Sequence, residues 1–274
     1  MTAAALDTFA SQPRARGDLS LHVGPRGGAT HIRDFFQSGS LKALFPRTPH
    51  TALTAVMLNT AGGLTGGDRF DLRCTAEKGA NLVLTTQAAE RVYRAQPGEV
   101  ARVNTTLQAN DATLHWLPQE MILYDGAALD RRLRIDCNGA ARVLMVEPVV
   151  FGRTAMRERV EDLQFSDRVD IYRDGALAFA DRTRLDGNAD DTLSRKAVAA
   201  GAGAMASVVL SAPDAHLSLD PARALLPDTG GASLLAENLL FIRLLACDSF
   251  TLRKYLLPLI TCLGVDPLPR TWML

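Results

Sequence analysis

The chain has 274 residues, of which 47% are hydrophobic, so it is long enough to bury a substantial core in one large domain or two small ones. Its 30 Lys and Arg residues equal its 30 Asp and Glu residues, and this balance excludes the basic excess that drives sequence-independent binding of nucleic acid. The same neutrality favours association with other proteins and poor solubility of the free chain.

The sequence carries no signal for export or for insertion into a membrane. Residues 1–17 lack the continuous apolar region and the cleavage site of a signal peptide. Apolar runs such as Leu239–Ile242, which Arg243 ends, are far too short to span a bilayer. We therefore expect residues 1–18 to be a disordered tail and the protein to be cytoplasmic, without a membrane partner.

Residues 58–68 contain four glycines within six positions and end on a carboxylate. Glycine permits positive φ and close approach of the backbone, so this segment is predicted to be a tightly shaped loop. A phosphate-binding loop would continue with Gly-Lys-Ser/Thr into a helix, whereas residues 69–74 alternate between polar and apolar like a strand. The pattern favours a glycine turn between two strands over a nucleotide site.

Strand signals dominate residues 19–212, and a loose repeat of about 30 residues occurs within them. Each unit joins two alternating segments through a turn of Gly, Asn or Asp, which predicts an antiparallel hairpin. Units that repeat at this spacing tend to stack and share a core. We therefore expect a mainly β, layered, β-helix-like stack of hairpins within one domain over residues 1–274. The three units span residues 70–85, 103–116 and 133–146.

Later strand signals are local and clear. Asp174-Gly175 has the composition of a type I′ turn and lies between two alternating runs, which predicts a further hairpin. Residues 205–210 and 239–245 are apolar over most of their length and are predicted to be buried strands.

Helix signals come late, in residues 213–274, which we expect to mix helix and strand. Asp220 followed by Pro221 predicts a short helix that ends near Leu226. A longer helix follows, because apolar residues recur there at intervals of three and four. Asp248 or Ser249 is expected to cap this helix, and Pro258 to kink or interrupt it. Gly264 is expected to end it.

The sequence lacks the usual patterns of catalytic or tightly metal-binding residues. None of the five histidines forms His-x-His or His-Glu-x-x-His, and no Gly-x-Ser-x-Gly elbow occurs. No pair of the four cysteines has Cys-x-x-Cys spacing, and we expect Cys74 and Cys137 to be buried as small hydrophobic residues. These patterns predict neither catalysis nor a tightly bound cofactor.

Several acidic and amide side chains lie beside the glycine loop or within apolar runs. Glu147 is the sharpest case, because burying its charge alone would cost several kcal/mol. It either pairs with an arginine, such as Arg94, Arg132 or Arg153, or lines a hydrated passage. The residues that we select as a candidate metal path or partner interface are Asp68, Gln87, Glu90, Gln119, Glu120, Asp125 and Glu147.

Two glutamines occupy nearly equivalent positions in successive units. Gln87 and Gln119 are each followed within three residues by a glutamate. In a stacked structure, equivalent positions lie one above another. A ladder of amide and carboxylate groups at these positions would either brace a cluster of loops or line a cavity.

Five segments, taken together, resemble one family. They occupy residues 58–68, 85–94, 116–126, 151–156 and 174–181. In this order and with these gaps, they resemble the UreD family of urease accessory proteins, also called UreH, over nearly the whole chain.

The resemblance implies a scaffold and metallochaperone subunit that is needed for nickel insertion into urease and is not an enzyme. It implies a complex with UreF-like and UreG-like proteins and with the urease apoenzyme, and at most transient contact with nickel. One residue departs from the family's pattern. Arg157 stands where the family commonly has the glycine of Met-Gly-Glu, so a glycine-dependent turn there is in doubt.

A second reading is a free-standing β-solenoid enzyme that uses paired carboxylates. Glu90, Glu120 and Asp125 would then act as acid and base. Assays of the isolated chain, compared with co-purification of partners, distinguish an enzyme from a chaperone subunit.

Overall fold

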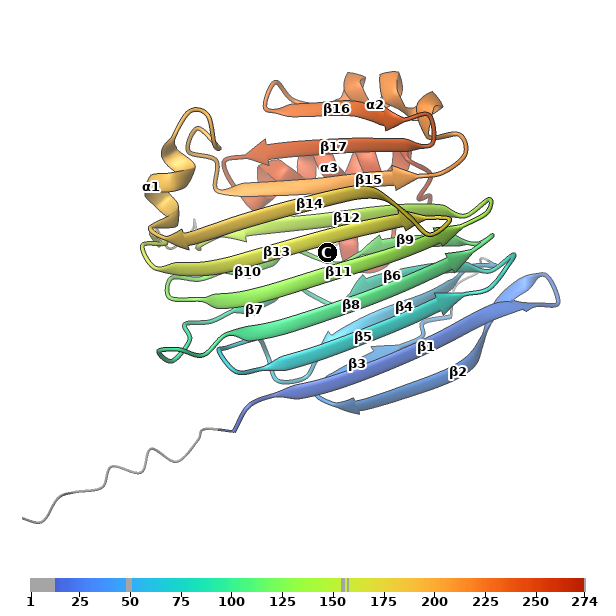
Figure 1. The fold of residues 1–274 in the computed structure, drawn as a ribbon, viewed down its shortest axis with the longest axis horizontal. Coiled ribbons are helices and arrows are strands. Elements are labelled where there is room, and N and C mark those ends of the chain that lie inside the picture. Colours follow the sequence, from blue (N-terminus) through green and yellow to red (C-terminus); the bar gives the residue numbers. More distant parts are fainter. Residues whose placement is uncertain (1–12, 48–50, 154–155, 157, 274) are drawn as a thin grey trace, which may run out of the picture.

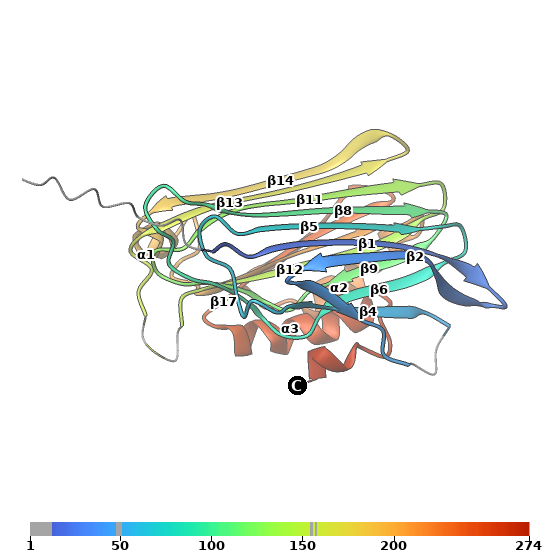
Figure 2. The ribbon, with the colours of Figure 1, turned by 90° about the horizontal axis from the view of Figure 1, so that it is seen from below.

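The computed structural model describes residues 13–47, 51–153, 156 and 158–273 of the chain. Over this part, two β-sheets pack face to face, and helices cover the outer face of one of them (Figures 1 and 2). The mainly β fold with a small helical part near the C-terminus is therefore confirmed.

Within the described residues, sheet A has seven strands and sheet B has ten. In order across sheet A these are β14 (Ala176–Gly187), β13 (Leu163–Arg173), β11 (Ala128–Asn138), β8 (Ala101–Asn110), β5 (Arg69–Ala76), β1 (Arg16–Arg26) and β2 (Ala29–Gly39). In sheet B they are β16 (Gly230–Ala236), β17 (Leu239–Ala246), β15 (Ala204–Ser211), β12 (Arg142–Phe151), β9 (Thr113–Leu117), β6 (Asn81–Thr86), β4 (Leu53–Asn59) and β3 (Leu41–Leu44), with β10 (Met121–Leu123) beside β12 and β7 (Glu90–Val92) beside β10.

The repeating units stack as coils of a solenoid. The first arms β5, β8 and β11 pair in parallel within sheet A, and the second arms β6, β9 and β12 pair in parallel within sheet B. The layered stack is confirmed, but the two arms of a unit do not pair with each other as an antiparallel hairpin. The turn between them carries the chain from one sheet to the other, since each arm must direct its apolar face into the space between the sheets.

The later strand predictions are confirmed. β13 and β14 form an antiparallel hairpin whose turn residues Asp174 and Gly175 both have positive φ, at 50° and 81°. A type I′ turn requires this conformation at both positions. The two predicted buried strands are β15 and β17, which pair with each other antiparallel and lie between β12 and β16 in sheet B.

The N-terminal boundary differs from the expected one. β1 begins at Arg16, so residues 16–18, which we expected in the tail, are paired with β2 and β5. Residues 1–12 lie outside the described part of the chain. The polar Arg16 and Asp18 gave no strand signal by themselves, because they lie on the outward face of the strand.

The helices are α1 (Ala189–Ser194), α2 (Leu219–Leu225) and α3 (Ser249–Cys262), with short 3-10 turns at Ala215–Ser218 and Arg270–Met273. α1 precedes residue 213, so helix is not confined to the C-terminal part. α2 begins before Asp220, which lies in its first turn and is not its cap. Asp248 caps α3 as predicted, with its carboxylate accepting from the Thr251 N–H at 2.7 Å.

Pro258 does not interrupt α3, although proline removes one helical hydrogen bond. The helix presents Leu252, Leu256 and Leu259 to the outer face of sheet B, where all three are buried among strand residues such as Val208. This packing stabilises the helix on both sides of the proline. The helix ends at Cys262, shortly before Gly264, whose φ is 103°.

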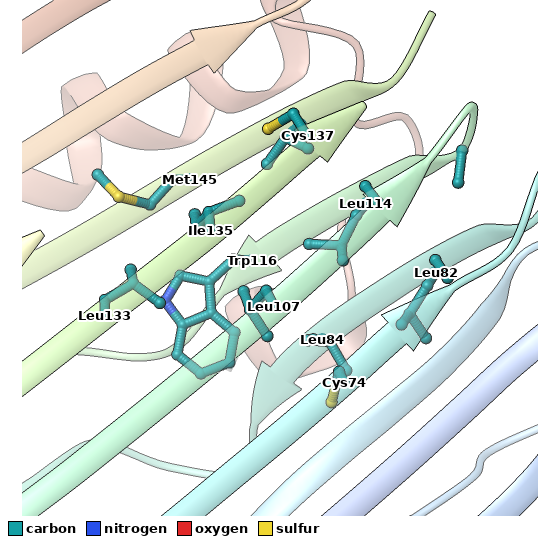
Figure 3. Packing of buried hydrophobic residues seen from close by; sticks show 14 of the residues in the cluster. Cys74, Leu82, Leu84, Leu107, Leu114, Trp116, Leu133, Ile135, Cys137 and Met145 are labelled. Carbon is teal, nitrogen blue, oxygen red and sulfur yellow. The ribbon is translucent and has the colours of Figure 1, made fainter. Parts of the chain in front are cut away.

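The main core fills the space between the sheets, as Figure 3 shows from close by. Leu107 of β8 and Leu114 of β9 have no exposed surface. The two cysteines of this core behave as expected, since burial raises the pKa of Cys74 to about 12 and that of Cys137 to about 11.

Truncation of the core should destabilise the fold far more than truncation of the surface. We expect Leu107→Ala to lower the free energy of unfolding by about 2–5 kcal/mol, because it leaves a cavity between the sheets. Leu177→Ala on β14, where the leucine is 54% exposed, should change it by no more than about 0.5 kcal/mol. Urea unfolding followed by tryptophan fluorescence measures both values, and equal losses would contradict the two-sheet core.

Candidate functional site between the two sheets

An interior cavity of about 100 Å³ lies between the two sheets, which is room for several water molecules. Most of its wall is apolar, with Leu72, Leu133 and Trp116 among its residues. A smaller group of polar side chains interrupts this wall. This group includes Asn59, Glu90, Gln119, Arg131 and Glu147.

Glu147 and Arg131 belong to a buried charged triad that joins the two sheets. Arg131 of β11 donates to Asp167 of β13 through Nε at 2.9 Å and Nη2 at 2.7 Å. Its Nη1 forms an ion pair with Glu147 of β12, on the opposite sheet. The indole N–H of Trp116 donates to the other oxygen of Glu147 at 2.5 Å. All four side chains are buried.

The ion-pair reading of Glu147 is confirmed, but its partner is none of the three arginines that the sequence suggested. Arg132 is adjacent to Arg131 on β11 and points to the outer face, where it pairs with Asp130. Strand alternation places Arg131 on the inward face with Leu129 and Leu133. The sequence analysis missed this triad, although Arg131 on the apolar phase of β11 and Asp167 on that of β13 are signals that could have identified it.

The triad contains two carboxylates and one guanidinium. Burial raises the pKa of Glu147 despite the neighbouring Arg131. Burial opposes the charge of Arg131 too, but the attraction of Asp167 and Glu147 outweighs it and raises the pKa of Arg131. The guanidinium therefore stays protonated.

Glu90 brings a second carboxylate to the same cavity. It begins β7, and its two oxygens accept from the Asn59 Nδ2 amide at 3.1 and 3.3 Å. Burial raises the pKa of Glu90 to about 7, and the hydrogen bond from Asn59 only partly offsets this. The side chain is half-buried, so it exchanges protons with solvent near neutral pH.

Gln119 lines the cavity with an amide that is only partly satisfied. The residue is 5% exposed, and its Oε1 accepts from Arg253 of α3 at 2.9 Å. Its Nε2 has no hydrogen-bond acceptor among the described residues. A buried donor of this kind is costly unless water or a ligand accepts from it, so this wall of the cavity suits polar contents.

Glu120 serves the packing of α3. Its Oε1 accepts from the Ser249 hydroxyl at 3.0 Å and lies 3.5 Å from Arg253 Nε. Gln87 is exposed, whereas Gln119 is buried, and no hydrogen bond joins these two glutamines within the described part of the chain. The expected ladder therefore does not form, because the chain leaves sheet B after Thr86.

Asp68 and Asp125 fasten loops. The carboxylate of Asp68 accepts from the backbone N–H groups of Ala15 at 2.7 Å and Thr65 at 2.8 Å, which closes the glycine-rich loop. Asp125 accepts from two backbone N–H groups at 2.9 Å and pairs with Arg94. Partial burial opposes its charge, but these donors lower its pKa. Arg157 lies outside the described residues.

Two features are absent from the described residues. No helix there is long and apolar enough to cross a membrane. No group of three or more His, Cys, Asp or Glu side chains lies close enough together to hold a metal ion.

Removal of the triad's guanidinium should strongly destabilise the fold. We expect Arg131→Met to lower the free energy of unfolding by about 3–5 kcal/mol, because Glu147 and Asp167 remain buried without their counter-charge. The matched control is Arg132→Met, one residue along, which breaks an exposed pair and should cost at most about 1 kcal/mol. Urea unfolding of both variants tests the triad, and similar losses would argue against it.

The raised pKa of Glu90 predicts a specific dependence of stability on pH. Below its ordinary value of 4.5 the carboxyl is protonated in the folded and unfolded states alike. Between there and about 7 only the folded state keeps the proton, so the contribution of Glu90 to stability falls as pH rises.

Glu90→Gln should therefore flatten the decline in the free energy of unfolding across this pH range. Urea unfolding at about pH 5 and about pH 8 measures the decline. Glu237→Gln, which alters an exposed acid in the turn between β16 and β17, should keep the slope of the unchanged protein. An unaltered slope in Glu90→Gln would refute the raised pKa.

Comparison with known proteins shows one family over nearly the whole chain. The family model described as "UreD urease accessory protein" matches residues 15–273. A urease accessory protein UreD of Ruegeria pomeroyi is 49% identical over 247 residues, which cover 90% of this chain and 96% of that protein. UreD proteins of Roseobacter denitrificans and Rhizobium etli are 46% and 42% identical, over 96% and 100% of both chains. This chain belongs to the UreD family of urease accessory proteins.

Proposed function

We propose that the chain acts as a scaffold and metallochaperone subunit during nickel insertion into urease, in a complex with UreF-like and UreG-like proteins and the urease apoenzyme. Membership of the UreD family over residues 15–273 supports the accessory role. The nickel route and the partners go beyond that membership. A cytoplasmic location likewise stays a prediction.

The observation that carries the nickel route is the meeting of Glu90, Gln119 and Glu147 at one interior cavity. A divalent ion in transit needs oxygen ligands that bind it without trapping it. The carboxylates of Glu90 on β7 and Glu147 on β12 meet that need, because no single strand or loop presents them as a closed set, whereas the Oε1 of Gln119 already accepts from Arg253.

Glu90 is suited to a transient contact. With its pKa raised to about 7, its carboxyl is partly ionised at neutral pH. Ionised, it attracts a cation; protonated, it releases one. Glu147 is held by Trp116 and Arg131, so its carboxyl group has a fixed position at the cavity.

The reading as a free-standing enzyme has less support. Glu120 is engaged by Ser249 and Arg253, and Asp125 by two backbone N–H groups and Arg94. Glu90 alone of the three lines the cavity. An acid–base pair would need two of them within reach of one substrate.

The proposal predicts that assembly and nickel loading respond separately to Glu90→Gln. The amide keeps the size of the side chain but removes its charge, so the variant should co-purify with UreF-like and UreG-like partners while the urease produced contains less nickel. Glu237→Gln, which alters an exposed acid away from the cavity, should leave both unchanged.

The measurements are co-purification and metal analysis of the purified urease. Normal nickel content with Glu90→Gln would remove Glu90 from the route. Loss of assembly would instead assign Glu90 a structural role. Failure of the unchanged chain to co-purify with these partners would contradict the complex itself.

A further inference from the structure

Three arginines lie side by side on the outer face of sheet A. Arg16 of β1 pairs in register with Arg69 of β5, and Arg69 pairs in register with Arg102 of β8. All three side chains are exposed, and neighbouring strands are about 4.8 Å apart. The row therefore presents three guanidinium groups over roughly 10 Å.

The row borders a depression of about 320 Å³. Its other walls include Gly67, Gly98 and two acids, Asp68 and Glu99. Both acids already have partners: Asp68 accepts from two backbone N–H groups, and Glu99 pairs with Arg14. Arg14 offsets the charge of Glu99, so Asp68 is the one acid of this wall without a cationic partner among the described residues, against three arginines.

None of the three arginines forms an ion pair or a side-chain hydrogen bond with any described residue. Acids do lie on the same face. Asp18 and Asp71 follow Arg16 and Arg69 by two residues, but neither comes within ion-pair distance, and Asp71 accepts from Asn104 at 3.0 Å. Elsewhere on this face the same spacing produces pairs, as between Arg134 and Asp136 at 2.8 Å.

Like charges on directly opposed strand positions repel each other. The fold nevertheless places three together at a hollow, where an anion would relieve the repulsion. Arginine binds phosphate groups through two parallel N–H donors. Three arginines in a row span a greater length than one small carboxylate can contact, so a larger anion with several oxygens fits them better. We propose that this depression is a binding site for a diphosphate-type oxyanion, separate from the interior cavity.

The sheet itself separates the two sites. Phe70 and Val103 direct their side chains to the interior cavity, while the adjacent Arg69 and Arg102 border the depression on the outer face. Binding at the depression therefore needs no entry into the core and does not depend on the nickel route.

The test is calorimetric titration of the full-length chain with inorganic pyrophosphate at low ionic strength. We expect saturable binding that sodium chloride weakens. Arg69→Gln, at the middle of the row, should weaken it about tenfold or more, as the loss of a charge-assisted hydrogen bond would. Arg73→Gln is the matched control, since Arg73 is an exposed, unpaired arginine of the same strand outside the depression.

Sulfate and a nucleoside diphosphate complete the design. Sulfate, with a single oxyanion group, should bind more weakly than pyrophosphate. The nucleoside diphosphate identifies the source of the group: equal affinity assigns recognition to the diphosphate alone, and tighter binding adds contacts from the nucleoside. Absence of saturable pyrophosphate binding, equal affinity for sulfate, or equal losses in Arg69→Gln and Arg73→Gln would overturn the proposal. Thermal unfolding of both variants verifies that they are folded.

Discussion

Parallel, in-register pairing of successive coils is the constraint on which the rest of this structure depends. It places each residue beside its equivalent in the next coil, so one choice of inward or outward phase is repeated across a whole sheet. Leu72 and Leu133 thus reach the same interior, and Arg69 and Arg102 the same outer face. A shift of one residue in any strand would exchange these two surfaces.

The charged triad is the exception that this constraint permits. An arginine and an aspartate occupy inward positions on β11 and β13, and a glutamate answers them from β12 of the other sheet. Desolvation of three charges is expensive, so the triad contributes little net stability compared with apolar packing. What it adds is a fixed polar contact between the sheets, beside a cavity that close-packed leucines would fill.

The C-terminal helix links this interior to the rest of the chain. α3 covers the apolar outer face of sheet B, and its first turns reach Gln119 and Glu120 through Arg253 and Ser249. The same helix therefore buries a sheet and sets the position of an amide on the cavity wall. A change in how α3 packs on sheet B would move Gln119 directly, because Arg253 of α3 donates to it.

Much of this architecture follows from local sequence. Period-two alternation marked the strands, Asp174-Gly175 marked a hairpin, Asp248 marked the start of α3, and five spaced segments marked the family, because each of these signals acts over a few residues. The choice of partners required the tertiary structure. Alternation of polar and apolar residues shows that an arm has an inward face but not which strand lies beside it. The prediction that the two arms of each unit pair with each other was therefore wrong. It also left open that Arg131 meets Glu147, that Asp68 and Asp125 hold loops, and that Glu90 joins Gln119 at one cavity, since these contacts form only when coils distant in sequence close upon each other.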